Sequence, residues 1–410
     1  MGFNLKSLDR NWVEGISGQE LLARVQSETK LIQGQDQLLV INQTNPHDFA
    51  VEFFAAVSAG RSIALANPNW GAQEREQFDA LLGLGAPPLP GAISSATRLK
   101  SGRQAKVILI PTGGTTNGIK LATHTWETLE VACKGVQQFL GGGAIDSCCV
   151  LPLYHVSGLM QLLRAYHSGG YIRFDEDEVE GRCLSYVPTQ LRRALLDKKR
   201  TQALTTTRVI FVGGAPISES LAAAARKLKL PVMPVYGMTE TAAMVAAIPV
   251  EDFLADPRAG ALPIGDTNIE IDSSGRIRVQ SPALFIGYHG GESLDLTRGY
   301  LTEDEGYIDE NERLHVTGRI DRLVISGGEK INPREVEDAV SALAGIEEVT
   351  ALGLPDPEWG QKLVVYYTGQ ELVDWKERLK EQLATYKLPK EMLRVDRLPL
   401  DEKGKFLRPS

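Results

Sequence analysis

The sequence predicts an α/β protein: a large N-terminal domain of mostly parallel sheets covered by helices, an antiparallel β subdomain, and a smaller α+β C-terminal domain. Three observations support this prediction. Up to about residue 260, short apolar segments typical of buried strands are followed in turn by segments with helical periodicity. After residue 260, apolar and polar residues alternate one by one, as in antiparallel strands. The chain has 410 residues, which is too long for one ordinary core.

The region before residue 100 repeats a strand and helix pattern. Residues 37–41 and 62–65 are apolar enough for buried strands. Pro46 opens a helix, because proline fits the first helical turn, and a second helix is expected over residues 74–82. This βα repetition predicts a mostly parallel sheet covered by helices.

A segment rich in glycine and threonine, Pro111–Lys120, follows the apolar strand Val107–Ile110. Its composition suits phosphate binding, because glycine lets backbone N–H groups approach an anion, threonine hydroxyls donate, and Lys120 adds a positive charge. We expect the segment to continue neither strand nor helix. The sequence excludes a Walker P-loop, because Ile119 precedes the lysine and Leu121 follows it. A plain surface turn stays open.

The middle of the chain continues the pattern of buried strands. Thr125 caps an expected helix, and strands are expected over residues 148–153, 209–212 and 232–235. Because parallel strands end at one edge of their sheet, we expect four polar or glycine-rich strand tips to line one crevice. These tips are Thr112, His155, Gly213 and Tyr236.

The region after residue 260 has the two-residue period of antiparallel strands. Hairpins are expected over residues 269–279 and 306–317. Asn332 then caps a helix that begins at Pro333. The last expected elements are strands over residues 348–354 and 363–368 and a helix over residues 372–383.

The bulk composition limits the function classes. With 44 Lys+Arg and 52 Asp+Glu the net charge is −8, which argues against a general binder of nucleic acid. No apolar run approaches the roughly 18 residues of a membrane span, and the N-terminus lacks a signal-peptide core. We therefore expect a cytoplasmic protein without integral membrane association, and a homo-oligomer stays open. Four cysteines are expected to be reduced core residues: Cys133, Cys148, Cys149 and Cys183.

Several motifs resemble, in order along the chain, those of the adenylate-forming superfamily of acyl-CoA and aryl-CoA ligases, adenylation domains and luciferases. The matching segments are TGGTTNGIK, LYHVSG, VGGAP, YGMTET, TEDEGY, GRIDRLVISGGEKINPREVE and the terminal GKF. The resemblance implies an enzyme that joins a small-molecule carboxylic acid to the AMP part of ATP, forming an acyl-adenylate and releasing pyrophosphate. It then transfers the acyl group to the thiol of coenzyme A. The implied ligands are ATP, Mg²⁺ and coenzyme A.

By the same resemblance, these motifs form the ATP site. The residues that hold the phosphates are Thr112, Gly114, Thr115, Thr116 and Lys120. The residues around adenine are Tyr236, which stacks on it, Gly237, Met238 and an opposite wall of Gly213, Gly214, Ala215 and Pro216. The remaining contacts are Asp304 to both ribose hydroxyls, Arg319 to ribose or phosphate, and Glu240 to Mg²⁺. The implied catalytic residues are Lys405, His155, Lys120 and Thr239.

The resemblance also implies an acyl pocket and a mobile C-terminal domain. The pocket comprises His155, Ser157, Gly214 and Gly237. Asp321 matches the hinge, which implies an N-terminal domain of residues 1–318, a hinge of residues 319–322 and a mobile domain of residues 323–410. Before rotation of this domain, Lys405 bridges the carboxylate and the α-phosphate. After rotation, the coenzyme A tunnel is shaped by Ser326, Gly327, Gly328 and Glu329.

The segments TGGTTNGIKLATHTW and YVPTQLRRAL resemble those of o-succinylbenzoate–CoA ligases of menaquinone and phylloquinone biosynthesis. This acid has two carboxylates, so its pocket needs apolar walls and one donor for the carboxylate that does not react. The candidate donors are Arg164, Arg192 and Arg193. The phosphate loop departs from the superfamily pattern TSGTTGxPK at Gly113, Asn117 and Ile119. Two alternatives stay open: another aryl- or acyl-CoA ligase, and a non-catalytic nucleotide-binding relative.

Overall fold

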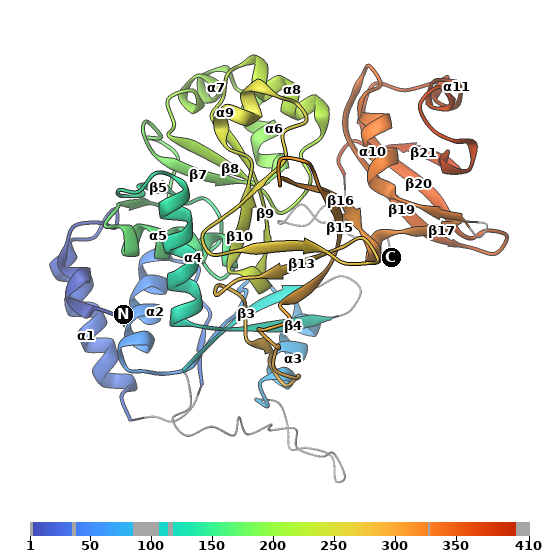
Figure 1. Cartoon of the computed structure of the whole chain (residues 1–410). Coiled ribbons are helices and arrows are strands. Elements are labelled where there is room, and N and C mark those ends of the chain that lie inside the picture. Colours follow the sequence, from blue (N-terminus) through green and yellow to red (C-terminus); the bar gives the residue numbers. More distant parts are fainter. Residues whose placement is uncertain (1–2, 35–37, 85–105, 114–117, 327–328, 399–410) are drawn as a thin grey trace, which may run out of the picture.

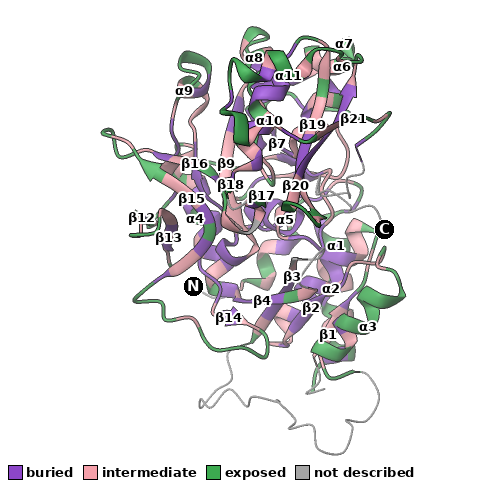
Figure 2. Cartoon of the chain, turned by 90° about the vertical axis from the view of Figure 1, so that its right-hand side faces the viewer, coloured by how far each residue is buried: buried purple, intermediate pink, exposed green. Residues whose placement is uncertain are grey.

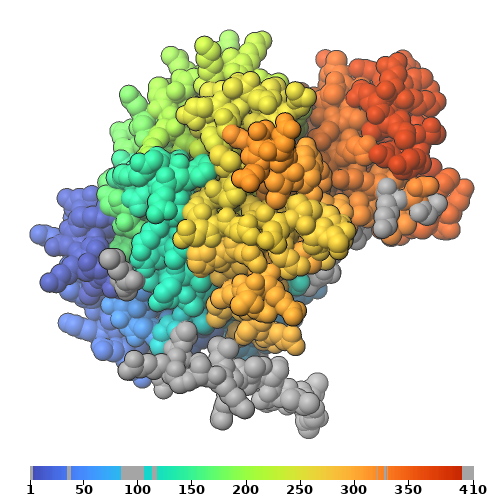
Figure 3. Space-filling model, in the orientation of Figure 1, coloured from blue at the N-terminus to red at the C-terminus, as the bar shows by residue number. Residues whose placement is uncertain are grey.

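The computed structural model of the protein describes residues 3–34, 38–84, 106–113, 118–326 and 329–398. Figure 1 shows a large body of sheets and helices, with a smaller C-terminal lobe at one side. The central strands are largely buried, and the exposed residues gather on outer helices and loops (Figure 2). In the space-filling view the C-terminal residues form a lobe that projects from the larger body (Figure 3).

The first sheet has five strands in the order β1-β2-β3-β4-β14, and its first three strands run parallel. The strands are β1 (Leu39–Ile41), β2 (Ile63–Leu65), β3 (Val107–Gly113), β4 (Ile119–Thr125) and β14 (Gly287–Tyr288). The N-terminal helices are η1 (Leu5–Asp9), α1 (Gly18–Ile32), α2 (Pro46–Ser58) and α3 (Ala72–Leu81). The predicted helix at Pro46 is confirmed, and the Asn45 side chain caps it.

The second sheet has seven strands in the order β11-β10-β9-β8-β7-β5-β6. The strands are β5 (Ser147–Cys148), β6 (Ile172–Arg173), β7 (Cys183–Tyr186), β8 (Val209–Val212), β9 (Val232–Met238), β10 (Ala243–Ala247) and β11 (Leu262–Pro263). Strands β5 to β9 pair in parallel, as predicted. Helices α4 (Trp126–Phe139) and α5 (Val156–Ser168) lie side by side (Figure 1). The other helices of this region are α6 (Pro188–Leu196), α7 (Lys198–Leu204), α8 (Glu219–Lys227), η2 (Thr239–Thr241) and α9 (Val250–Ala255).

Two hydrophobic cores position these layers. One core joins α2, the first sheet, α4 and α5, and includes Phe54, Leu129 and Leu162. The other lies between the second sheet and helices α6 to α8, and includes Ile210 and Leu221. Burial of such side chains stabilises the fold by roughly 25 cal/mol for each Å² removed from water.

The antiparallel subdomain and the C-terminal lobe also follow the predicted pattern. The four-stranded subdomain comprises β12 (Asn268–Ile271), β13 (Arg276–Gln280), β15 (Tyr300–Ile308) and β16 (Leu314–Arg319). The short helix η3 (Ile320–Arg322) leads into the lobe. The lobe comprises β17 (Val324–Ser326), β18 (Glu329–Ile331), α10 (Pro333–Ser341), β19 (Ile346–Asp356), β20 (Gly360–Gly369), α11 (Trp375–Lys380), η4 (Thr385–Lys387) and β21 (Glu391–Arg394).

The expectation that the four strand tips belong to one parallel sheet is wrong. Thr112 lies within β3, which pairs with β4 as an antiparallel hairpin in the first sheet. Tyr236 lies within β9, which continues to Met238 and pairs antiparallel with β10 in the second sheet. The tips therefore come from two sheets. The glycine-rich composition indicated a turn but not that the strands on both sides of it would pair.

The predicted strand over residues 148–153 is also wrong beyond Cys148, because β5 ends there. Pro152 cannot donate a ladder hydrogen bond, and it directly precedes the turn into α5. The four cysteines are buried and form no disulfide, as predicted. Within the described parts of the chain, no helix is both long and apolar enough to cross a bilayer.

Candidate active site

Three predicted nucleotide-binding residues form one cluster where β9 meets the antiparallel subdomain. The Tyr236 hydroxyl donates to Oδ2 of Asp304 at 2.8 Å, and Nη1 of Arg319 lies 3.3 Å from Oδ1. Asp304 and Arg319 are paired in register across β15 and β16, so the two strands fix this ion pair. Asp304 is only 5% exposed, and burial, followed by the charge of Asp304, raises the pKa of Tyr236. We call these three residues the Tyr236 cluster.

A second cluster brings together the predicted metal residue and the predicted phosphate lysine. The Tyr288 hydroxyl donates to Oε1 of Glu240 at 2.6 Å. Nζ of Lys120 lies 5.2 Å from the centre of the same tyrosine ring, within the range of a cation–π contact. Tyr288 pairs with Ala122 across β14 and β4, and this register places its ring diagonally beside Lys120. We call Lys120, Tyr288 and Glu240 the Glu240 cluster.

Tyr300 connects the two clusters. It lies on β15, the strand that carries Asp304, and its hydroxyl is 3.2 Å from that of Tyr288. Burial raises the pKa of Tyr300, the charge of Glu240 raises it further, and the charge of Arg319 opposes them. Because charges from both clusters act on one phenol, the clusters are neighbours in a single site.

The residues of the Glu240 cluster fit a magnesium ion that is shared with phosphate groups. Tyr288 occupies Oε1, and no other hydrogen bond reaches the Glu240 carboxylate from the described residues. Nor do these residues contain any group of three or more His, Cys, Asp or Glu side chains that would form a complete metal cage. Magnesium keeps several waters and binds through one or two carboxylates and phosphate oxygens, so a single carboxylate suffices.

His124 belongs to the site and was missed in the sequence analysis. It is fully buried on β4, and its Nε2 donates to the carbonyl oxygen of Thr239 at 2.8 Å. Its Nδ1 lies 3.0 Å from Oγ1 of Thr128. Burial lowers the pKa of His124 to about 4, so the ring is neutral and holds the segment that carries Glu240. Tyr288 and Tyr300 were missed too, since only the fold brings these residues together.

The backbone beside Glu240 is strained. Ala242 and Ala243 have φ values of 51° and 79°, a region that residues with a Cβ rarely adopt. At Gly237 an added Cβ would overlap the carbonyl oxygen of Ala243 on β10, so only glycine fits there. Such strain persists where the surrounding structure overdetermines it, often at functional sites.

The structure also places other predicted nucleotide-binding residues. Thr112 is directly opposite Lys120 in the β3–β4 hairpin. Gly213 and Gly214 follow β8, and Gly214 has a φ of 80°, which favours glycine. Ala215 and Pro216 continue this turn toward α8. Several predicted residues lie outside the described residues, namely Gly114, Thr115, Thr116, Gly327, Gly328 and Lys405.

The residues predicted for the acyl pocket and the hinge lie at the boundaries of elements. His155 is at the N-cap position of α5 and packs edge-on against Tyr154, with ring centres 4.7 Å apart. Ser157 is in the first turn of α5. Asp321 lies in η3, and Ser326 pairs with Glu329 across the β17–β18 hairpin.

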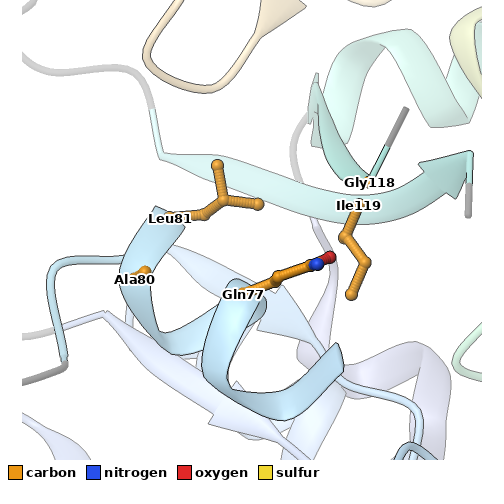
Figure 4. A pocket seen from close by; sticks show the side chains of 5 residues that line it. All are labelled: Gln77, Ala80, Leu81, Gly118 and Ile119. Carbon is orange, nitrogen blue, oxygen red and sulfur yellow. The ribbon is translucent and has the colours of Figure 1, made fainter. Parts of the chain in front are cut away.

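A hollow of about 390 Å³ lies beside the phosphate segment, between α3 and the start of β4. Figure 4 shows its lining: Gln77, Ala80, Leu81, Gly118 and Ile119. None of these side chains is charged, and none belongs to either cluster. We therefore place the candidate active site at the two clusters and not in this hollow.

Comparison with known proteins identifies the family of this chain. The family model of AMP-binding enzymes matches residues 95–289, and the model of the C-terminal domain of AMP-binding enzymes matches residues 335–405. The chain is 32% identical to the 2-succinylbenzoate–CoA ligase of Lactococcus lactis subsp. lactis over 319 residues, 73% of this chain and 69% of the relative. It is 30% identical to that of Enterococcus faecalis over 325 residues, 72% of this chain and 67% of the relative.

Two solved structures share the fold. The o-succinylbenzoate CoA synthetase (MenE) of Bacillus subtilis, in complex with the acyl-adenylate intermediate OSB-AMP, is similar with a TM-score of 0.79 at 24% identity, over 97% of this chain and 93% of that one. ATP-bound MatB of Rhodopseudomonas palustris has a TM-score of 0.81 at 22% identity, over 99% and 97% of the two chains. The predicted fold class is thus confirmed. With its motifs, its site and its relatives in agreement, this chain belongs to the family of AMP-binding enzymes.

Proposed function

We propose that the protein is an ATP-dependent acid–CoA ligase that converts 2-succinylbenzoate to its CoA thioester through an acyl-adenylate. The ligases of Lactococcus lactis and Enterococcus faecalis that are 30% or more identical to it are named for this acid. The MenE structures with OSB-AMP, and with ATP and magnesium ion, support the same intermediate and ligands. The product would serve menaquinone or phylloquinone biosynthesis.

In the first half-reaction, a carboxylate oxygen of the acid attacks the α-phosphorus of ATP, and the bond to the pyrophosphate oxygen breaks. We assign adenine to the Tyr236 ring, the ribose to Asp304 and Arg319 beside it, and the phosphates to Lys120. The Lys120 ammonium has no ion-pair partner among the described residues. Mg²⁺, held through Glu240, would neutralise charge on the phosphate oxygens. Preorganised donors and charges of this kind supply most of the acceleration in phosphoryl transfer.

In the second half-reaction, the thiol of coenzyme A attacks the acyl carbon, AMP leaves, and the thioester forms. We assign this step to a rotated C-terminal domain of residues 323–410, with residues 319–322 as the hinge. Ser326 and Glu329, at the hairpin that follows η3, would then line the coenzyme A tunnel. His155 and Ser157 would border the acyl group.

Arg164 is the observation that favours an acid with a second carboxylate. It is 3% exposed within α5, its guanidinium lies 5.2 Å from the Phe211 ring, and its Nη1 is 3.8 Å from Sδ of Met244. No carboxylate within the described part of the chain forms an ion pair with it. A buried, unpaired charge is costly, which suits a site that an anionic ligand completes. The other candidates fit less well: Arg192 lies 4.0 Å from Glu348, and Arg193 is exposed.

The surroundings of Arg164 support this assignment. Ser185 is in register with Phe211 on the neighbouring strand, so its side chain shares the sheet face over which the guanidinium lies. The Ser185 hydroxyl is buried and has no hydrogen-bond partner among the described residues. Ser157 and Arg164 are two turns apart on one face of α5, a separation of about 10 Å. An acid lying along α5 would therefore have one carboxylate near Ser157 and the other at Arg164.

Two assays test the function. ATP–pyrophosphate exchange and coenzyme A ligation are measured with 2-succinylbenzoate, with fatty and aryl acids, and with analogues that lack either carboxylate. We expect turnover with 2-succinylbenzoate and, for Arg164→Met, a rise of about 100-fold in its KM. The Arg193→Met variant is the matched control. Turnover with a different aryl or acyl acid would favour the other ligases, and exchange with none would favour a non-catalytic relative.

The same proposal includes a cytoplasmic location, because the substrates ATP and coenzyme A are cytoplasmic. Its partners would be small molecules only, and a homo-oligomer is compatible with it. Cell fractionation and light scattering of the purified protein test these two points.

A further inference from the structure

We infer that Tyr288 is a positioning residue that orients Glu240 toward the metal through its hydroxyl and Lys120 toward the phosphates through its ring. This inference rests on the proposed function and assigns a role to a residue outside the predicted site. Its basis is that one side chain contacts both a carboxylate and a lysine from separate elements, η2 and β4.

The hydrogen bonding around Tyr288 has a defined direction. The Glu240 carboxylate can only accept, so the Tyr288 hydroxyl donates to Oε1 at 2.6 Å. The Tyr300 hydroxyl, at 3.2 Å, is then the donor to Tyr288. Glu240 is 6% exposed, and this charge-assisted bond holds its carboxylate in one orientation, with Oε2 left for a cation.

The position of the Tyr288 ring is itself fixed by packing. Its backbone pairs with β4, and Phe285 lies edge-on against both Tyr288 and Tyr300 at 5.0 and 5.1 Å. The amide of Phe285 also donates to the backbone carbonyl of Glu240 at 2.9 Å. The position of the ring therefore depends on neither Lys120 nor the Glu240 carboxylate, so the ring can orient both side chains.

The Tyr288 hydroxyl donates to Glu240, the proposed metal ligand, so its effect on the metal is indirect. A residue that orients a metal ligand in this way typically contributes a factor of about 10 to 100 in metal affinity.

The test measures ATP binding by calorimetry at increasing Mg²⁺ concentrations, using the full-length protein. Tyr288→Phe removes only the hydroxyl, and Tyr307→Phe is the matched control, because the Tyr307 side chain is exposed on β15 and belongs to neither cluster. We expect Tyr288→Phe to raise the Mg²⁺ concentration at half-maximal effect about 10-fold or more. The Mg²⁺-free affinity for ATP should stay unchanged, and Tyr307→Phe should resemble the wild type.

Tyr288→Leu removes the ring as well, and we expect it to weaken Mg²⁺-free ATP binding about threefold, the size of a surface cation–π contact. An unchanged Mg²⁺ dependence in Tyr288→Phe, or an equal shift in Tyr307→Phe, would overturn the role of the hydroxyl. Unchanged Mg²⁺-free affinity in Tyr288→Leu would overturn the role of the ring. If the wild type itself shows no Mg²⁺-dependent ATP binding, the proposed function fails instead.

Discussion

At the scale of single residues, the buried charges of Asp304 and Arg164 differ in whether an oppositely charged group lies beside them. Asp304 is satisfied, because Tyr236 and Arg319 occupy its two oxygens. Arg164 is different, since its contacts within the described residues are a carbonyl oxygen, a sulfur and an aromatic ring, and none of them is an anion. Buried charges are normally paired, so Arg164 is the one of the two that lacks an opposite charge within the described residues.

Lys120 provides the first prediction at this scale. Lys120→Ala should lower ATP–pyrophosphate exchange about 100-fold, because it removes one preorganised charge from the transferring phosphates. The residue is exposed, so the melting temperature should change little. Lys134→Ala, which removes a lysine paired with Glu130 away from the site, is the control. A collapse of the melting temperature in Lys120→Ala would instead indicate a structural role.

His167 provides a second prediction, which concerns pH. Burial lowers the pKa of His167 to about 4, against 6.5 for a free histidine. Between about pH 4 and pH 6.5 the His167 ring binds a proton in the unfolded chain but not in the folded protein. The stabilising effect of the neutral ring is therefore complete above about pH 6.5 and is lost as the pH falls toward 4, up to about 3 kcal/mol.

We expect His167→Phe, which keeps an aromatic ring against Trp126 and Tyr166, to flatten the decrease in unfolding free energy over this pH window. Urea denaturation of both proteins at several pH values measures it. Parallel curves for the two proteins would mean that another group causes the acid sensitivity.

At the scale of elements, local chemistry was a good guide to helices. Thr125 and Thr128 form a capping box at the start of α4, and Ser218 and Asn332 cap α8 and α10. Strand pairing was less predictable. The β3–β4 and β9–β10 hairpins were missed, because pairing depends on register and on neighbours that a local pattern does not contain.

Gly237 in β9 tests the second of these hairpins. Gly237→Ala should lower the unfolding free energy by about 3 kcal/mol, because the new methyl group would overlap the Ala243 carbonyl of β10. Gly34 has a φ of 79° but open space around it, so Gly34→Ala should lower the unfolding free energy by only about 1 kcal/mol, from backbone strain. Chemical denaturation measures the unfolding free energy of both variants. Equal decreases would show that the close β9–β10 contact adds nothing to the cost of backbone strain.

At the scale of the whole molecule, three polar contacts join the described part of the C-terminal lobe to the larger body. Arg334 donates to the Val316 carbonyl at 2.8 Å, and Asn332 donates to the Thr317 carbonyl at 3.1 Å. Arg192 and Glu348 form a 4.0 Å ion pair between the two parts. The Arg192–Glu348 pair lies at the outer limit of an ion-pair distance, and the other two contacts are single hydrogen bonds, so these contacts are weak enough for the domain rotation that the proposed function requires.

Lys405→Ala tests that rotation. We expect it to reduce acyl-adenylate formation at least 100-fold and to spare thioester formation from supplied acyl-adenylate, because the resemblance to the adenylate-forming superfamily implies that the lysine serves only the first orientation. Rates of the two half-reactions, measured separately, decide the outcome. An equal loss in both would contradict domain alternation.

The sequence by itself determined the main helices, the parallel strands β7 to β9, the order of the motifs and the family, because helix caps, apolar periodicity and glycine-rich segments are local signals. The tertiary structure decided which residues share a site. Lys120, Glu240 and Asp304 lie far apart in sequence, and Tyr288, Tyr300 and His124 join the site only because β4, β14, η2 and β15 meet there. The physical reason is that hydrogen bonds and charge interactions act over a few ångströms, and the pairing of distant strands sets those distances.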